Sequence, residues 1–383
     1  MLSLADTIAQ ISRLNRSTGG LNVPAGRDRL MELENFGSNP GALRAKLFVP
    51  AKLQVRPALV VVLHGCTQTA AGYDLGSGWS QLADRYGFVL LFPEQQRSNN
   101  PNLCFNWFVP EDSRRGSGEA LSIQQMIAAM IDRHDIDATQ VFVTGLSAGG
   151  AMASVMLATY PDVFAGGAII AGLPYGCAST IPQALERMGG RGGPTAPELA
   201  ALVLDASDHR GPWPTLSIWH GSGDATVNPT NSSAIVDQWR ELHGVGAEPT
   251  RTEAVDGYPR RVWCDDGRRE VIEEYSITGM GHGTPLDTLS GDGCGQSGAY
   301  MLETSISSTH HICRFWGLAR ESEGSEALDP VSPALPKNNG RRALAAAPLS
   351  DAPAQRVAFE APAPSETIGK AIEGALRAAG LMR

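Results

Sequence analysis

The stretch Gln140-Val-Phe-Val-Thr-Gly-Leu-Ser-Ala-Gly-Gly-Ala-Met-Ala-Ser154 decides the fold. Its apolar, β-branched start is typical of a buried strand, and its small residues from Ala148 onward favour a helix. The two elements would meet at Gly145-Leu-Ser-Ala-Gly149, a Gly-x-Ser-x-Gly turn with Ser147 at its apex. Glycines suit both flanks because side chains there would collide with the strand or the helix. The stretch therefore predicts a strained turn that exposes the Ser147 hydroxyl at the carboxyl end of a sheet.

A chance match to this pentapeptide is the alternative, because the chain contains 43 glycines. The position of the pentapeptide between a buried strand and a helix favours the turn. The amino terminus of that helix would also favour negative charge that develops beside the serine.

Composition bounds the class of protein. The 383 residues are 42% hydrophobic and 19% charged, which allows one large α/β domain with appendages, or two domains. A net charge of −9 argues against a nucleic-acid partner. No apolar run approaches the ~18 residues of a membrane span. The first residues, 1–13, contain Asp6 within a short apolar stretch and no basic lead-in, so we expect a cytoplasmic protein, or a secreted one if the native start is trimmed.

The six cysteines are widely spaced and form no Cys-x-x-Cys pair, so we expect neither a zinc site nor another metal site. Free thiols are the default in a reducing cytoplasm. A disulfide remains open, because Cys66 and Cys104 both lie in predicted loops. The full set is Cys66, Cys104, Cys177, Cys264, Cys294 and Cys313.

Apolar runs and helical patterns alternate along the chain, which predicts a mainly parallel sheet with helices on both faces. Strands are expected at 42–49 (an antiparallel edge), 58–63, 88–92, 141–143, 165–171 and 215–219, with a hairpin or twisted strands in 250–280. Helices are expected at 79–86, 119–134, after the serine turn, at 235–242 and at 299–316.

Composition also divides the chain into segments. An N-terminal helix and connector (1–30) precede the α/β domain (31–320), within which 173–214 reads as an insertion with two short helices over the carboxyl edge of the sheet and the active site. An Ala/Pro-rich linker (321–364) leads to an amphipathic helix (365–383). We expect this last helix either to dock on the domain or to bind a partner.

A serine hydroxyl needs an adjacent base that is oriented by a carboxylate. Asp224 follows the predicted strand at 215–219, and His282 follows the last strand between glycines. The order Ser, Asp, His, each after a strand, therefore predicts a triad of Ser147, Asp224 and His282. The alternatives are a turn or capping role for Asp224 and an ordinary loop role for His282. Competing residues are Asp208, Asp265, His209, His220, His243, His310 and His311.

The tetrahedral oxyanion of an acyl transfer needs hydrogen-bond donors. We expect one from the backbone N–H of Ala148, directly after the serine, and one from Cys66, in the loop after the strand at 58–63. His64 and Gly65 would let this loop bend close to the serine. A reactive Cys66 thiol is the less favoured alternative, because the turn already presents a nucleophile.

At these residues the chain resembles the poly(3-hydroxybutyrate) depolymerase family of esterases, in the α/β-hydrolase superfamily. The resemblance covers about residues 43–316 and omits the linker and the last helix. It implies an α/β-hydrolase fold and a serine esterase without a cofactor, which cleaves esters of short hydroxyacids through an acyl-enzyme. The segments that carry it are Leu63-His-Gly-Cys-Thr-Gln68, Cys104-Phe-Asn-Trp-Phe108, Gly145-Leu-Ser-Ala-Gly149, Trp219-His-Gly-Ser-Gly-Asp224 and Gly281-His-Gly-Thr-Pro285.

The same family includes feruloyl and acetylxylan esterases, so another small ester is the alternative substrate. Many relatives are secreted and carry a polymer-binding domain, and this chain shows neither feature; we therefore expect action on storage granules, soluble oligomers or small esters inside the cell. Phe105, Trp107 and Trp263 are candidates to line the substrate site; for Trp107 the alternative is packing as core under its loop. A different class, a granule- or partner-binding protein that acts through residues 365–383, is the second hypothesis.

Overall fold

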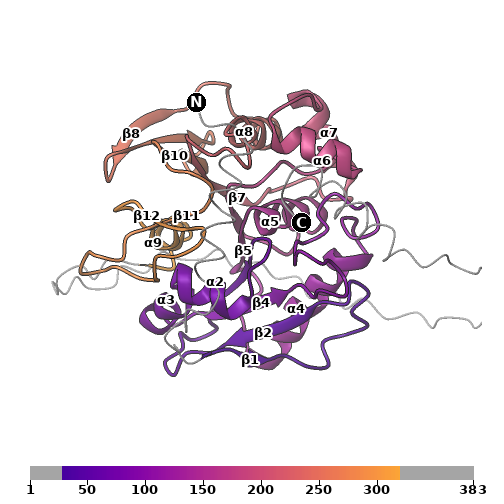
Figure 1. Cartoon of the computed structure of the whole chain (residues 1–383), viewed down its shortest axis with the longest axis vertical. Coiled ribbons are helices and arrows are strands. Elements are labelled where there is room, and N and C mark those ends of the chain that lie inside the picture. The colour runs from indigo at the N-terminus through magenta and orange to yellow at the C-terminus, as the bar shows by residue number, and fades with distance from the viewer. Residues whose placement is uncertain (1–27, 320–383) are drawn as a thin grey trace, which may run out of the picture.

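A twisted sheet runs through the part of the chain that a computed structural model describes, residues 28–319 (Figure 1). The predicted helix near the N-terminus, the linker and the helix at 365–383 lie outside these residues. Within them the main sheet has ten strands in the order β1-β2-β4-β3-β5-β6-β7-β10-β9-β8. The strands are β1 (Met31–Glu32), β2 (Arg44–Phe48), β3 (Leu59–Leu63), β4 (Val89–Glu94), β5 (Val141–Leu146), β6 (Gly166–Ile170), β7 (Thr215–Gly221), β8 (Arg251–Val255), β9 (Tyr258–Cys264) and β10 (Glu270–Ile277).

The centre of the sheet is parallel, and both edges are antiparallel. Strands β4, β3, β5, β6, β7 and β10 are parallel neighbours, whereas β1 and β2 pair antiparallel at one edge and β9 and β8 at the other. The expected parallel core with an early antiparallel strand is therefore confirmed. Because the carboxyl ends of parallel strands share one edge of a sheet, the loops after β3, β5, β7 and β10 gather there.

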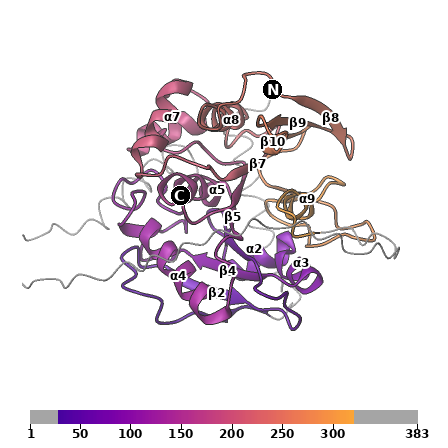
Figure 2. The same cartoon turned by 180° about the vertical axis from the view of Figure 1, so that it is seen from behind.

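Successive strand residues point into two different cores, as pleating requires. Val61 and Val143 face the helices α4 and α5 and the helices beside them, while Val60 and Phe142 face α2, α3 and α9. Figures 1 and 2 show the two groups of helices on opposite faces of the sheet. The helices are α2 (Ala70–Ser77), α3 (Trp79–Tyr86), α4 (Gly118–His134), α5 (Ala148–Thr159), α6 (Ile181–Met188), α7 (Ala196–Asp205), α8 (Thr230–His243) and α9 (Ser308–Phe315).

The segment 173–214 contains the two short helices that its sequence predicts, α6 and α7. Helix α7 packs against α8 and α5 and so extends the helical layer on that face of the sheet. That the segment covers the active site stays a prediction.

The predicted helix at 299–316 is wrong in its first half. Residues Met301–Glu303 form strand β12, which pairs in parallel with β11 (Thr284–Leu286), and the helix begins only at Ser308. Ser305 has a positive φ of 58° between the two elements, a conformation that a continuous helix excludes. Helix α2 was not predicted from the sequence.

Candidate active site

The serine turn has the conformation that its sequence predicts. Ser147 lies between β5 and α5 with φ 58° and ψ −117°, and it is partly exposed. Its backbone N–H donates to the carbonyl oxygen of Ile170, at the end of β6. A Cβ on Gly149 would lie 2.5 Å from the carbonyl oxygen of His64, and nearer still to that of Leu63. Only glycine fits there, because the β3 loop approaches so closely.

The two other predicted triad residues form a hydrogen bond. The loops after the neighbouring strands β7 and β10 bring His282 Nδ1 to 2.7 Å from Asp224 Oδ2. Since a carboxylate only accepts, Nδ1 carries the proton and Nε2 keeps its lone pair. The other oxygen of Asp224 accepts from the backbone N–H groups of Thr226 and Val227, at 2.8 and 2.9 Å. Asp224 is thus a turn-forming residue as well as the partner of His282.

The charge of Asp224 is stabilised at a buried position. Burial alone would raise its pKa, but the contact with His220, the hydrogen bonds from His282 and the backbone, and the charge of His282 hold that pKa well below its usual range. The carboxylate therefore stays ionised at neutral pH and can stabilise a positive charge on the His282 imidazole.

Among the competing residues, His220 alone contacts this pair, and the others are engaged elsewhere. His220 Nε2 lies 3.4 Å from Asp224 Oδ2. His209 and His243 bond backbone carbonyls, His310 contacts Tyr86, His311 pairs with Asp256, Asp265 pairs with Arg269, and Asp208 is exposed.

The loop after β3, which contains the predicted oxyanion donor Cys66, is held in place by the ring of His64. The buried His64 ring is held between the carbonyl oxygen of Gly65, 2.8 Å from Nδ1, and the backbone N–H of Gln95, 3.1 Å from Nε2. Burial lowers the pKa of His64, so the ring is neutral and serves to shape the loop. In residues 28–319, the backbone N–H groups of Cys66 and Ala148 have no acceptor, so both can donate to a substrate oxygen.

Cys66 and Cys104 form a disulfide bond, with Cα atoms 4.2 Å apart. The expectation of free thiols is therefore wrong for these two residues, and so is the alternative of a reactive Cys66 thiol. The two loops also share a backbone hydrogen bond of 2.7 Å, from Thr67 to Asn102. The other cysteines, Cys177, Cys264, Cys294 and Cys313, are free.

The aromatic candidates for substrate contact are mostly core residues. Phe105 is 0% exposed, and its ring centroid lies 5.0 Å from that of His64, so it packs as a core residue against the ring that holds the loop after β3. Trp263 is likewise buried, on β9. Trp107 is 8% exposed and packs edge-on against Phe108; its contact with substrate stays a prediction.

Tyr300 is a site residue that the sequence did not reveal. Its ring lies nearly perpendicular to the His282 imidazole, with centroids 6.0 Å apart. The sequence pattern placed Tyr300 inside a helix, but its φ of 61° turns the chain toward β12. Tyr300 thus packs against the edge or face of the His282 ring.

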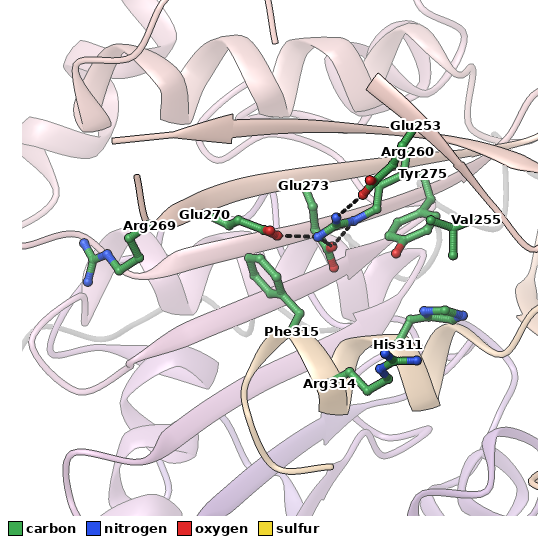
Figure 3. Close-up of a pocket in the computed structure, with 10 residues that line it drawn as sticks. All are labelled: Glu253, Val255, Arg260, Arg269, Glu270, Glu273, Tyr275, His311, Arg314 and Phe315. Carbon is green, nitrogen blue, oxygen red and sulfur yellow. Dashed lines mark hydrogen bonds and ion pairs between the residues drawn. The ribbon is translucent and has the colours of Figure 1, made fainter. Parts of the chain in front are cut away.

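A separate polar cavity of about 520 Å³ lies between the β8–β10 strands and α9 (Figure 3). None of the predicted site residues lines it. Its centre is Arg260, which forms ion pairs with Glu253, Glu270 and Glu273. These pairs tie the three antiparallel strands together, so we interpret the cavity as a structural ion-pair network. In the described part of the chain, this cavity included, no group of three or more His, Cys, Asp or Glu side chains could hold a metal ion.

None of the helices in residues 28–319 is long and apolar enough to cross a membrane.

Comparison with known proteins gives consistent similarities. The family model described as "Esterase PHB depolymerase" matches residues 43–255. Poly(3-hydroxyalkanoate) depolymerase C of Paucimonas lemoignei is 46% identical over 291 residues, which cover 76% of this chain and 70% of that protein. Feruloyl esterase B of Talaromyces stipitatus is 32% identical over 267 residues, 67% of this chain and 73% of that protein. Among solved structures, an acetyl xylan esterase from Aspergillus awamori aligns with a TM-score of 0.63 and 28% identity, and covers 76% of this chain and 99% of that one.

Proposed function

The chain belongs to the esterase PHB depolymerase family and is a carboxylic ester hydrolase with the α/β-hydrolase fold, and on this premise we propose that Ser147, His282 and Asp224 are its catalytic triad. The observation that carries the proposal is the 2.7 Å hydrogen bond from His282 Nδ1 to Asp224. Asp224 follows β7, which lies two strands along the sheet from β5 and the strained Ser147 turn. This bond leaves His282 Nε2 as the base.

The proposed reaction has two steps through an acyl-enzyme. Ser147 Oγ attacks the ester carbonyl carbon while His282 Nε2 takes its proton, and the carbonyl oxygen becomes an oxyanion that accepts from the N–H groups of Cys66 and Ala148. The C–O bond to the alcohol then breaks, and His282 returns the proton to the leaving oxygen. Water attacks the acyl-enzyme by the same route and releases the acid and Ser147. Asp224 stabilises the imidazolium in both steps.

The proposed substrates are esters of short hydroxyacids, as polyhydroxyalkanoate polymer or oligomer. Support comes from the 46% identity to a poly(3-hydroxyalkanoate) depolymerase, which exceeds the 32% identity to a feruloyl esterase. A feruloyl, acetylxylan or other small ester is the second candidate, favoured by the structural similarity to an acetyl xylan esterase.

The test is a kinetic panel with purified protein. Hydroxybutyrate oligomers, polyhydroxybutyrate, p-nitrophenyl butyrate, a feruloyl ester and an acetylated xylan are compared by kcat/KM, and the hydroxybutyrate esters are expected to rank first. Ser147→Ala should abolish hydrolysis of every substrate while circular dichroism stays unchanged. Retained activity in that variant would refute the triad, whereas a different ranking would refute only the substrate class.

Contact with a granule or partner through residues 365–383 is a further proposal, which the amphipathic pattern of that segment supports. A chain that ends at Arg320 should keep its activity on soluble ester and lose its sedimentation with polyhydroxybutyrate granules. Loss of binding without loss of activity supports a targeting role, and unfolding of the shortened chain contradicts it.

The cytoplasmic location stays a prediction. The disulfide between Cys66 and Cys104 supports the alternative of an oxidising compartment, where such bonds persist. Cell fractionation, combined with thiol labelling before and after reduction, separates the two: a disulfide intact in an extracytoplasmic fraction contradicts the cytoplasmic prediction.

A further inference from the structure

His220 stands at the end of β7, buried beside the proposed acid of the triad. Its Nε2 lies 2.9 Å from the carbonyl oxygen of Val227 and 3.4 Å from Asp224 Oδ2. Both neighbours are acceptors, so Nε2 must carry the proton. The shorter contact, to Val227, is the hydrogen bond, and the contact with Asp224 is a weaker electrostatic one.

The main chain of Val227 links His220 to the same carboxylate a second time. Its carbonyl accepts from His220, and its N–H donates to Asp224 Oδ1 at 2.9 Å. His220 therefore acts on both carboxylate oxygens: directly on Oδ2, the atom that accepts from His282, and through Val227 on Oδ1. Rotation of the carboxylate would break contacts on both sides.

The other ring nitrogen of His220 shows that packing alone does not explain this residue. Nδ1 is buried and has no hydrogen-bond partner among the described residues. A buried polar atom without a partner is unfavourable, and an apolar side chain at this position would avoid it. The unfavourable burial of Nδ1 is explained if the imidazole is retained because its Nε2 donates to Val227 and contacts Asp224. Within residues 28–319, Asp224 is the one titratable side chain that contacts His220, and His220 and His282 are the titratable side chains that contact Asp224.

We infer that His220 is a positioning residue, which holds the Asp224 carboxylate in the orientation that His282 needs. This inference rests on the proposed triad. It predicts an effect on the chemical step and little effect on substrate binding, because His220 is buried and Asp224 lies between it and the imidazole.

The experiment compares three substitutions whose polar atoms differ in reach. His220→Gln can place an amide N–H near the position of Nε2, His220→Asn can reach only the position of Nδ1, and His220→Leu has no donor. We expect His220→Leu and His220→Asn to lower kcat on p-nitrophenyl butyrate about tenfold, the size expected when one buried hydrogen bond is lost, with KM within about twofold. His220→Gln should recover most of kcat.

The control is His243→Leu, because His243 also bonds a backbone carbonyl, that of Pro214, but lies away from Asp224. It should lower the melting temperature and leave kcat of the folded protein unchanged. If His220→Leu does not fold, the comparison of kcat between His220→Gln and His220→Asn tests the inference. Equal kcat in that pair, or a wild-type kcat in His220→Leu, would overturn the inference. Failure of the proposed triad is a different result, since Ser147→Ala would then retain activity.

Discussion

Cys104 holds Cys66 through a disulfide bond that joins two loops 38 residues apart in the chain. Cys66 directly follows the His64–Gly65 bend, and its backbone N–H is a proposed oxyanion donor. The side chain of Cys66 thus determines where its own main chain lies, although its sulfur takes no part in the reaction.

Breaking this bond should reduce both stability and turnover. For Cys104→Ser we expect a loss of about 2–4 kcal/mol in the free energy of unfolding. We also expect kcat to fall, by up to about 10²-fold if the N–H of Cys66 is no longer held in place. Denaturant titration and ester kinetics measure the two effects. Cys264→Ser, which alters a free thiol on β9, is the control and should change neither. An unchanged kcat in Cys104→Ser would show that the remaining loop contacts are sufficient.

The close approach of the β3 loop to α5 predicts that Gly149→Ala is strongly destabilising. Its new Cβ would overlap two backbone carbonyl oxygens, which cannot move aside as a flexible side chain could. We expect a loss of about 3 kcal/mol or more, measured by thermal or denaturant unfolding. Gly246→Ala is the matched control, because a Cβ there meets its nearest atom at 3.9 Å. Equal stability of the two variants would contradict the tight turn.

Asp224→Asn should disable the proposed base without disturbing the fold. The asparagine amide can donate to His282 Nδ1, which favours the wrong tautomer and leaves Nε2 protonated. We expect kcat to fall by about 10³–10⁴-fold with a small change in KM. Asp208→Asn, in the exposed loop after α7, tests a competing carboxylate and should be silent. Loss of activity in Asp208→Asn but not in Asp224→Asn would reverse the assignment.

Glu273, at the centre of the Arg260 network, makes stability depend on pH (Figure 3). Burial raises the pKa of Glu273 to about 7 from an ordinary 4.5, although Arg260 acts in the opposite direction. The folded protein therefore keeps this proton at pH values where the unfolded chain has lost it. The contribution of this proton to the free energy of unfolding is therefore fully present below about pH 4.5 and is lost as the pH rises through about 7.

Glu273→Gln removes this titration. Its free energy of unfolding, relative to the wild type, should rise by up to about 3 kcal/mol between about pH 4.5 and pH 8. Denaturant titrations across this range measure the difference. Glu253→Gln, at the exposed end of the same network, is the control and should show no such trend. A constant difference for Glu273→Gln would mean that Arg260 keeps the carboxylate ionised throughout.

The parts that were predicted from the sequence are those that local chemistry specifies. The serine turn needs its glycines within a few residues. Asp224 follows a strand that an apolar run already marks, and His282 follows the strands expected in 250–280. Contacts between distant segments could not be read in this way. The disulfide depends on how the loops after β3 and β4 fold together, and the partners of His220 depend on the course of the turn after β7.

Two errors have a physical reason. Residues Met301–Glu303 carry a pattern that fits a helix, but pairing with β11 and the positive φ of Ser305 favour a strand. Phe105 was proposed for the substrate site because aromatic residues suit an acyl group, yet it is completely buried against His64. Periodicity and residue type do not specify which side of a loop faces solvent.

The position of α6 and α7 between β6 and β7 has an evolutionary consequence. The chain leaves the sheet after Ile170 and rejoins it at Thr215, and the two strands pair in unbroken register from Gly166 to Ile170. The forty-odd residues between them can lengthen, shorten or be exchanged while β5, β7 and β10 keep their positions. On the prediction that this segment covers the active site, changes in it would alter the surroundings of the ester while the strands that carry the proposed triad keep their places, which would give one scaffold a route to new substrates.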